Sequence, residues 1–429
     1  MASRRTPKRD PRQTISRVAL AAVALSPLIF SGGADPFRLP KEILIRAATI
    51  VIAAAFGIAL LFGQTRITRE QLRRPEVLLP LAIMGWTGIC ALMATNRALA
   101  AFGLLYVWSM AVLWLALQSS VRTLRLETAL LIVLAPALIN ALLAILQRLR
   151  IWNPFHFAPD TTPNLMNTGL LGNPDYVGAY LVAPALVAAA AAIASSQRRW
   201  LFAGIAVLLS GGTLIVHSIT AVAALMVGLI ALAWMLHWQR ALIGTLAVIV
   251  AVILATAVYK PLHARFDLAL DHFSEGDYDA LLSGRLGAFA AAWEMVVDHP
   301  VTGVGPHCYR YQFFNYRLLA SDRYPEAMRF AEKGANFGET HNDHLQVLAE
   351  TGLPGYALML TAMVLIAARS FRRTADPSPQ HRFATLLALP LILSLATLAL
   401  AQFPLALPAV LALYLFLSAL VVRWTEEPA

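Results

Sequence analysis

Charged residues are scarce in this chain of 429 residues. They make up 14% of the sequence, against about 25% in a typical soluble domain, whereas hydrophobic residues reach 59%. Lysine occurs only as Lys8, Lys41, Lys260 and Lys333, so arginine carries nearly all of the net charge of +10. These proportions exclude an ordinary soluble domain and predict an all-α, polytopic membrane protein.

Several motifs are also missing. Cys90 and Cys308 are the only cysteines, which excludes a disulfide framework and a CxxC metal or redox site. The sequence has no P-loop, no GxGxxG after a strand, no HExxH and no GxSxG, so ATP-driven transport and metalloprotease chemistry have no support. No basic stripe is interleaved with aromatic residues. We therefore expect no nucleic-acid partner and attribute the basic charge to topology and membrane lipid.

Apolar runs fill most of the chain. Because a bilayer span needs about 20 apolar residues, we predict about twelve transmembrane helices, the first of them an uncleaved span rather than a signal peptide. Their expected ranges are 15–31, 43–63, 76–95, 98–118, 126–147, 172–194, 200–217, 219–237, 241–259, 344–368, 383–401 and 404–422.

The basic residues predict the orientation of these spans. Counted over alternate short loops, one side holds twenty and the other six. Since basic residues are retained on the cytoplasmic side, we expect both termini in the cytoplasm. This assignment requires that 200–217 and 219–237 form a tight hairpin, because one continuous helix would invert everything after it.

Two segments on the other side are long enough to fold, 149–171 and 260–343. The second divides the chain into transmembrane helices 1–9 (1–259), a large periplasmic loop (260–343) and helices 10–12 (344–429). Within the loop, apolar residues recur at helical spacing from Leu286 to Asp298, which predicts an amphipathic helix.

Ionisable residues gather just before the tenth predicted span. His341, Asn342 and His344 lie at its mouth, and Gly352 and Gly355 interrupt it about two turns later. Broken helices at membrane depth line polar cavities, and histidine is the commonest general base or acid. His341 and His344 could instead cap the helix, be solvated or bind a metal, although no third metal ligand has a convincing spacing.

Three further polar positions are candidates. Arg285, in a Ser-Gly-Arg turn before a helix, suits phosphate oxygens. Asn173 lies at the start of the sixth span, where it could cap the helix or contact a ligand, and His217 lies in the hairpin turn.

Together these residues resemble the signature of the O-antigen ligase and O-antigen polymerase superfamily. The resemblance rests on Ser283-Gly-Arg285, on Gly303-Val-Gly305 and on His341-Asn342 followed by Glu350 and Gly352. It implies a GT-C-type glycosyltransferase without metal or other cofactor. The donor would be a glycan on undecaprenyl diphosphate, His341 would deprotonate or orient the acceptor hydroxyl, and Arg285 would hold the diphosphate. Direct attack on the anomeric carbon would invert its configuration.

The chain departs from this pattern at two places. Many members carry Ser-Arg where this chain has Ser218-Ile219, so one diphosphate-binding arginine is missing, and His217, Arg265 or Arg310 could replace it. His344 stands where an aromatic residue is common. We expect Asn342 and His344 to contact substrate beside His341.

The preferred hypothesis is an O-antigen ligase in the bacterial inner membrane, with its active site on the periplasmic side. It would join a lipid-linked glycan to the lipid A core. The alternative is a polymerase of lipid-linked repeat units. A transporter of lipid-linked glycans is disfavoured, because the predicted spans are nearly free of charge and show no internal repeat.

Overall fold

The computed structural model describes residues 11–426 apart from 33–34, 66, 156–166, 196, 237–238, 240–241, 247–249, 251–259, 332–335, 373 and 375–376. The described residues form helices and connections without any strand. The chain is therefore all-helical in this part, as the sequence predicts.

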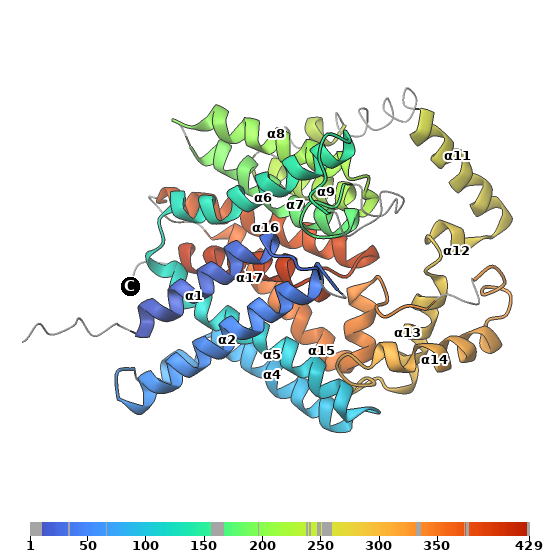
Figure 1. Ribbon diagram of the computed structural model, residues 1–429, viewed down its shortest axis with the longest axis horizontal. Coiled ribbons are helices and arrows are strands. Elements are labelled where there is room, and N and C mark those ends of the chain that lie inside the picture. Colours follow the sequence, from blue (N-terminus) through green and yellow to red (C-terminus); the bar gives the residue numbers. More distant parts are fainter. Residues whose placement is uncertain are drawn as a thin grey trace, which may run out of the picture.

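The helices fall into two groups (Figure 1). The apolar bundle consists of α1 (Pro11–Leu25), α2 (Arg38–Leu61), α4 (Pro75–Met93), α5 (Arg97–Ser120), α6 (Leu126–Arg148), α7 (Pro174–Ala194), α8 (Arg199–Ile215), α9 (Ile219–Leu236), α15 (Asp343–Ala367), α16 (Pro379–Ala401) and α17 (Pro408–Trp424). The hydrophilic segment consists of α11 (Lys260–Glu275), α12 (Tyr278–Leu281), α13 (Leu286–Asp298) and α14 (Tyr309–Arg323). Short elements join them: α3 (Arg69–Arg73), η1 (Ser26–Leu28), η2 (Val121–Thr123), η4 (Ala368–Phe371) and η5 (Pro404–Ala406).

Eight described helices are long and apolar enough to cross a membrane, and three more apolar helices are shorter. The short ones are Gln13–Leu28, Arg199–Ile215 and Pro408–Trp424. A polytopic membrane protein is thus confirmed, and a helix lies at each predicted span except 241–259, which falls largely outside the described residues. The full number of twelve spans and the GT-C architecture stay predictions.

The centre of the bundle is α7. This helix is rich in alanine, and two thirds of its residues are buried against α8, α9 and α16. Its small side chains let neighbouring backbones approach closely, which is how transmembrane helices gain packing energy without a hydrophobic drive.

The connection between α8 and α9 decides the topology of everything that follows. Gly178, near the start of α7, lies against Val216 at the end of α8 and against Ala221 at the start of α9. Further along α7, Leu181 meets Gly212 of α8, and Leu186 meets Gly228 of α9. The two helices therefore run in opposite directions along α7, so the chain turns back here as a hairpin, as predicted.

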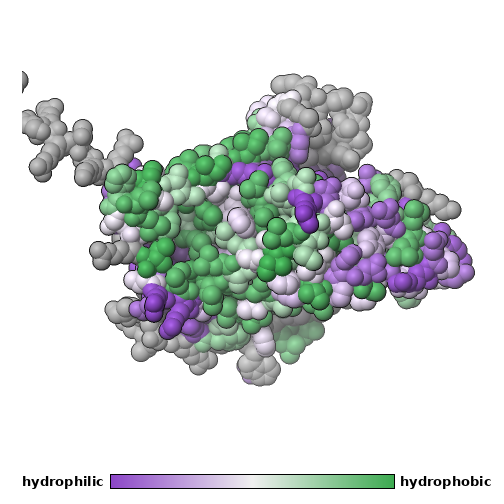
Figure 2. Space-filling view, turned by 90° about the horizontal axis from the view of Figure 1, so that it is seen from below, coloured by the Kyte–Doolittle hydropathy of each residue, from purple (hydrophilic) through white to green (hydrophobic). Residues whose placement is uncertain are grey.

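The two ends of the molecule differ in polarity. The start of α1 and the C-terminus lie at one end, which we call the terminal end, and α11–α14 lie at the opposite, polar end (Figure 1). Hydrophilic side chains cover the polar end, and apolar ones cover much of the bundle between the ends (Figure 2). The membrane band would thus lie across the bundle, with the hydrophilic segment on one side of it.

A break in α15 attaches the hydrophilic segment to the bundle. Gly352 has φ of 67° and leaves the helical conformation. The freed carbonyl oxygens of Ala349 and Glu350 accept from the amides of Val304 and Gly305 (2.8 and 3.1 Å), and the Leu353 amide donates to Pro300 O (2.8 Å). Backbone groups at membrane depth need such partners. The sequence prediction of an interrupted helix is confirmed, and the connection from Pro300 to Gly305 fills the gap.

Replacing the glycine at this break should destabilise the fold. A Cβ on residue 352 would lie 2.0 Å from the Val301 carbonyl oxygen, and its positive φ disfavours side chains. We expect Gly352→Ala to lower the free energy of unfolding by about 2–4 kcal/mol, measured by thermal unfolding of the detergent-purified protein. The control is Gly57→Ala in α2, where a Cβ meets nothing within 4 Å. Equal unfolding temperatures for the two variants would contradict this account.

Candidate active site

Arg285 and His341 meet at the polar end of the bundle. The Arg285 guanidinium, at the start of α13, donates from Nη1 to the carbonyl oxygen of Ala401, the last residue of α16 (2.9 Å). Two residues further on, the ring of Phe403 packs edge-on against the ring of His341, with centroids 4.8 Å apart. The connection between α16 and α17 therefore brings the two predicted site residues to one place.

A tight turn holds His341 immediately before α15. The residue has φ of 56°, a conformation that costs free energy and recurs at functional sites. Thr340 Oγ1 donates to Asn342 O (2.6 Å), and Asn342 Oδ1 accepts from the Leu345 amide (3.0 Å) to cap the helix. The Asn342 side chain, predicted to contact substrate, thus serves the helix cap, and the turn directs His341 toward Phe337 and Phe403.

The environment keeps His341 neutral. Burial, and then the positive charge of Arg285, lower the pKa of His341 to about 4, while the carboxylates of Glu339 and Asp175 act in the opposite direction. Both causes disfavour the imidazolium ion. At neutral pH the side chain is therefore an uncharged imidazole, which can accept a proton from a hydroxyl group.

The conformation of Arg285 is fixed by the turn before it. Ser283 and Gly284 both have positive φ, and Asp279 Oδ1 accepts from the Leu286 amide (2.9 Å) at the first turn of α13. The helix is thereby capped by Asp279, and the half-buried Arg285 side chain is turned back toward the bundle. Its guanidinium has donors beyond the one bonded to Ala401, which suits an oxyanion.

A polar cluster from three connections adjoins Arg285. Ser218 Oγ donates to Asp175 Oδ1 (2.6 Å), and Gln402 Nε2 donates to Ser218 Oγ (2.8 Å) and to Asp175 Oδ1 (3.3 Å). The charge of Asp175 also acts on Arg285. The nearby Asn173 is a predicted site residue. Its side-chain oxygen accepts from the Asp175 amide (2.8 Å) and so caps α7. We did not predict Gln402 as a site residue. Its one signal in the sequence is that a single glutamine interrupts the apolar run before α17.

Glu339 connects two arginines from distant parts of the chain. It accepts from Arg38 Nη1 (2.7 Å) on α2 and from Arg310 Nη2 (2.9 Å) on α14. Burial favours the neutral carboxyl group, but the charges of the two arginines and the bond from Arg38 outweigh it and hold the pKa of Glu339 below its usual value. Arg310, a predicted site residue, thus lies near His341. Arg38 was not predicted, because it is far from His341 in the sequence.

The remaining predicted site residues lie apart from His341. His344 faces α16, with Nε2 3.3 Å from Ala396 O and Nδ1 3.2 Å from the Tyr356 hydroxyl. His217 is exposed in the hairpin turn, 3.3 Å from Arg148 Nη2. Arg265 belongs to α11, and its side chain lies outside the described part of the structure. Among the described residues, no group of three or more His, Cys, Asp or Glu side chains could hold a metal ion.

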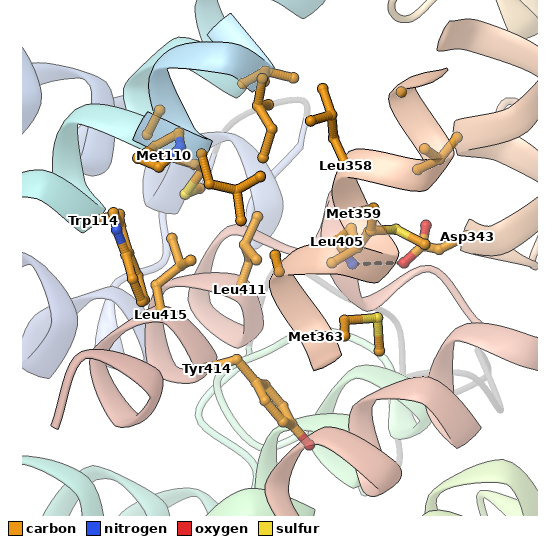
Figure 3. Close-up of a pocket in the computed structure, with 18 of the residues that line it drawn as sticks. Met110, Trp114, Asp343, Leu358, Met359, Met363, Leu405, Leu411, Tyr414 and Leu415 are labelled. Atoms are coloured by element: carbon orange, nitrogen blue, oxygen red, sulfur yellow. Dashed lines mark hydrogen bonds between the residues drawn. The ribbon is translucent and has the colours of Figure 1, made fainter. Parts of the chain in front are cut away.

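A cavity of about 540 Å³ begins beside this site and runs between α4, α5, α15, α16 and α17. Arg38, Glu339 and Asp343 line one polar end, and Met, Leu, Trp and Tyr side chains line much of its interior (Figure 3). Asp343 accepts from the Leu405 amide (2.7 Å), which ties α15 to the connection before α17. Neither His341 nor Arg285 lines the cavity.

The ion pairs of Glu339 should contribute measurably to stability. We expect Glu339→Gln to lower the free energy of unfolding by about 1–3 kcal/mol at pH 7, because it removes the charged acceptor of two arginines. Since the pKa of Glu339 lies below 4.5 in the folded protein, the difference should persist down to pH 4.5 and shrink as the pH falls further.

Thermal unfolding midpoints across this pH range test the expectation. Glu70→Gln, which alters an exposed glutamate of α3, serves as the control and should match the parent protein. A Glu339→Gln midpoint equal to that of the parent at pH 7 would show that the ion pairs are not stabilising.

A family model described as O-antigen ligase matches residues 204–360. The match includes Arg285, the break in α15 and His341, and it ends before the α16–α17 connection. No curated protein matches the chain significantly.

Proposed function

We propose that the chain is a glycosyltransferase that moves a glycan from undecaprenyl diphosphate to a sugar hydroxyl. The match of residues 204–360 to a family model described as O-antigen ligase supports this proposal. The observation that carries this proposal is the pairing of a neutral, half-buried His341 with Arg285 around the α16–α17 connection. The acceptor is proposed to be the lipid A core.

In the proposed reaction, His341 accepts the proton of the acceptor hydroxyl group. The oxygen of that hydroxyl group attacks the anomeric carbon of the donor sugar. The bond from that carbon to the diphosphate oxygen breaks, so undecaprenyl diphosphate leaves and the configuration inverts. Negative charge grows on the leaving group in the transition state, and a placed guanidinium stabilises it. Arg285 supplies that charge, so the mechanism requires no metal.

We assign the second diphosphate contact to Arg38. Ser218-Ile219 stands where many members of the superfamily have Ser-Arg, so Ile219 replaces the arginine, and Ser218 bonds to Asp175 and Gln402. Arg38 is a quarter exposed, lines the cavity and is positioned by Glu339. It therefore presents a fixed cation at the mouth of the cavity, where Arg310, also bonded to Glu339, adds a second.

The proposed orientation follows from the loop charges and from the placement of the ends. Both termini would be cytoplasmic, and the polar end would face the periplasm of the inner membrane. The site would then meet lipid-linked substrates at the outer leaflet, since Arg285 and His341 lie where the bundle meets the hydrophilic segment.

Loss of the base or of the guanidinium should abolish transfer. We expect His341→Ala to reduce the rate about 10²–10⁴-fold and Arg285→Ala to reduce it about 10²–10³-fold, in purified protein supplied with lipid-linked glycan and lipid A core. Products are resolved by gel electrophoresis. The exposed His217→Ala is the matched control and should keep near-parent activity.

The same assay separates the two candidate activities. Transfer to the lipid A core identifies a ligase, whereas a ladder of longer lipid-linked glycans without the core identifies a polymerase. Full activity of either His341→Ala or Arg285→Ala would refute the role assigned to that residue.

The pH dependence should differ between the free enzyme and the complex. In the free enzyme the pKa of His341 is about 4, so kcat/KM should decline only near pH 4 as the base becomes protonated. A bound diphosphate adds negative charge that offsets Arg285 and raises this pKa, which moves the acidic limb of kcat to a higher pH. Initial rates from pH 3.5 to 8 measure both limbs. An acidic limb of kcat at or below that of kcat/KM would exclude this electrostatic coupling.

A further inference from the structure

The cavity has a second polar mouth at the terminal end of the bundle. Arg369 and Arg372, on and just after η4, line it there. Arg369 follows the break at Gly352 by 17 residues, or roughly 25 Å of helix. The two polar mouths of the cavity therefore lie toward opposite ends of α15.

The charge at this mouth is positive. Neither guanidinium has a hydrogen-bond or ion-pair partner among the described residues. Glu76 also lines the mouth, but it faces Arg423 at 3.7 Å, and Arg423 is bonded to Glu426 (2.9 Å). Glu76 and Glu426 also attract Arg369, but both lie against Arg423. Among these described residues three arginines thus stand against two carboxylates, and the net positive charge can attract an external anion.

The interior above these arginines is apolar. It is lined by Met363 and Met359 of α15, by Trp114 of α5 and by Tyr414 of α17 (Figure 3). Met359 precedes Arg369 by ten residues, or about 15 Å of helix, which is half of the hydrocarbon thickness. One acyl chain of the leaflet at this end would fill that length.

We propose that this half of the cavity binds an anionic phospholipid from the leaflet at the terminal end. Its phosphate contacts Arg369 and Arg372, and one acyl chain lies along Met363 and Met359. Basic pockets between transmembrane helices recognise anionic headgroups in this way. The cavity volume of about 540 Å³ is within the range of about 300–1,000 Å³ found for ligand sites. The site is separate from the proposed reaction, because its phosphate lies at the other mouth.

Native mass spectrometry of the full-length protein tests the proposal. Purified protein is incubated with phosphatidylglycerol or with phosphatidylcholine of the same acyl chains. We expect a phosphatidylglycerol adduct that survives mild activation, and about 30-fold weaker binding in Arg369→Gln/Arg372→Gln, since each arginine contributes about a factor of five. The matched control, Arg122→Gln/Arg125→Gln, alters two exposed arginines at the same end and should bind like the parent protein.

A second variant tests the position of the chain. Met363→Trp narrows the cavity and leaves both arginines in place, so it should also lose the adduct while eluting as a folded protein. If the protein retained the two lipids equally, or if the two double variants bound phosphatidylglycerol equally, the adduct would be nonspecific annular lipid. Either result would overturn the proposal. Undiminished binding by Met363→Trp would likewise overturn it. Because no glycan donor is present, failure here would leave the proposed transferase activity standing.

Discussion

The backbone junction at the break in α15 is the constraint on which the site depends. A membrane-spanning helix cannot leave its carbonyl groups unpaired in hydrocarbon, so the break at Gly352 exists only because another segment supplies donors. The connection from Pro300 to Gly305 supplies two, and Trp86 Nε1 supplies a third to Thr351 O (2.8 Å). This segment directly follows α13, whose first turn holds Arg285. The pairing that closes the broken helix thereby sets the position of Arg285 relative to His341, which lies at the head of the same helix.

Electrostatic balance explains why the site needs both arginines and carboxylates. A diphosphate requires positive charge, but unopposed arginines beside an imidazole would depress its basicity still further. Glu339 and Asp175 both act against this effect on His341. Each also faces a cation, since Glu339 bonds Arg38 and Asp175 acts on Arg285. The carboxylates therefore moderate the field at the base while the arginines keep donors for phosphate oxygens.

The sequence predicted those parts of the structure that depend on local pattern. Hydropathy identified the helices of the bundle, and the glycines at 352 and 355 predicted the interrupted span. His341 and Arg285 were found because they belong to a short motif. Arg38 and Glu339 could not be found in this way, because they are 301 residues apart in sequence. Only the folded chain brings the start of α2 beside the turn that precedes α15. Asn173 and Asn342, which we predicted to contact substrate, use their side-chain oxygens to cap α7 and α15; the sequence pattern alone does not separate these two roles.

The two ionic groups near His341 bear on how an enzyme of the proposed kind could join two lipid-borne molecules. Under the proposed function both substrates would be confined to the outer leaflet, so they would approach from different directions within the membrane plane. Arg285 with Asp175, Ser218 and Gln402 forms one polar surface, built from α7, the α8–α9 turn and the α16–α17 connection. Arg38 with Glu339 and Arg310 forms another, built from α2 and α14. Only the second continues into the apolar cavity. Under the proposed function the donor would approach from the Arg38 side, with its diphosphate between Arg38 and Arg285. The acceptor hydroxyl then reaches His341 from the side that the cavity does not occupy.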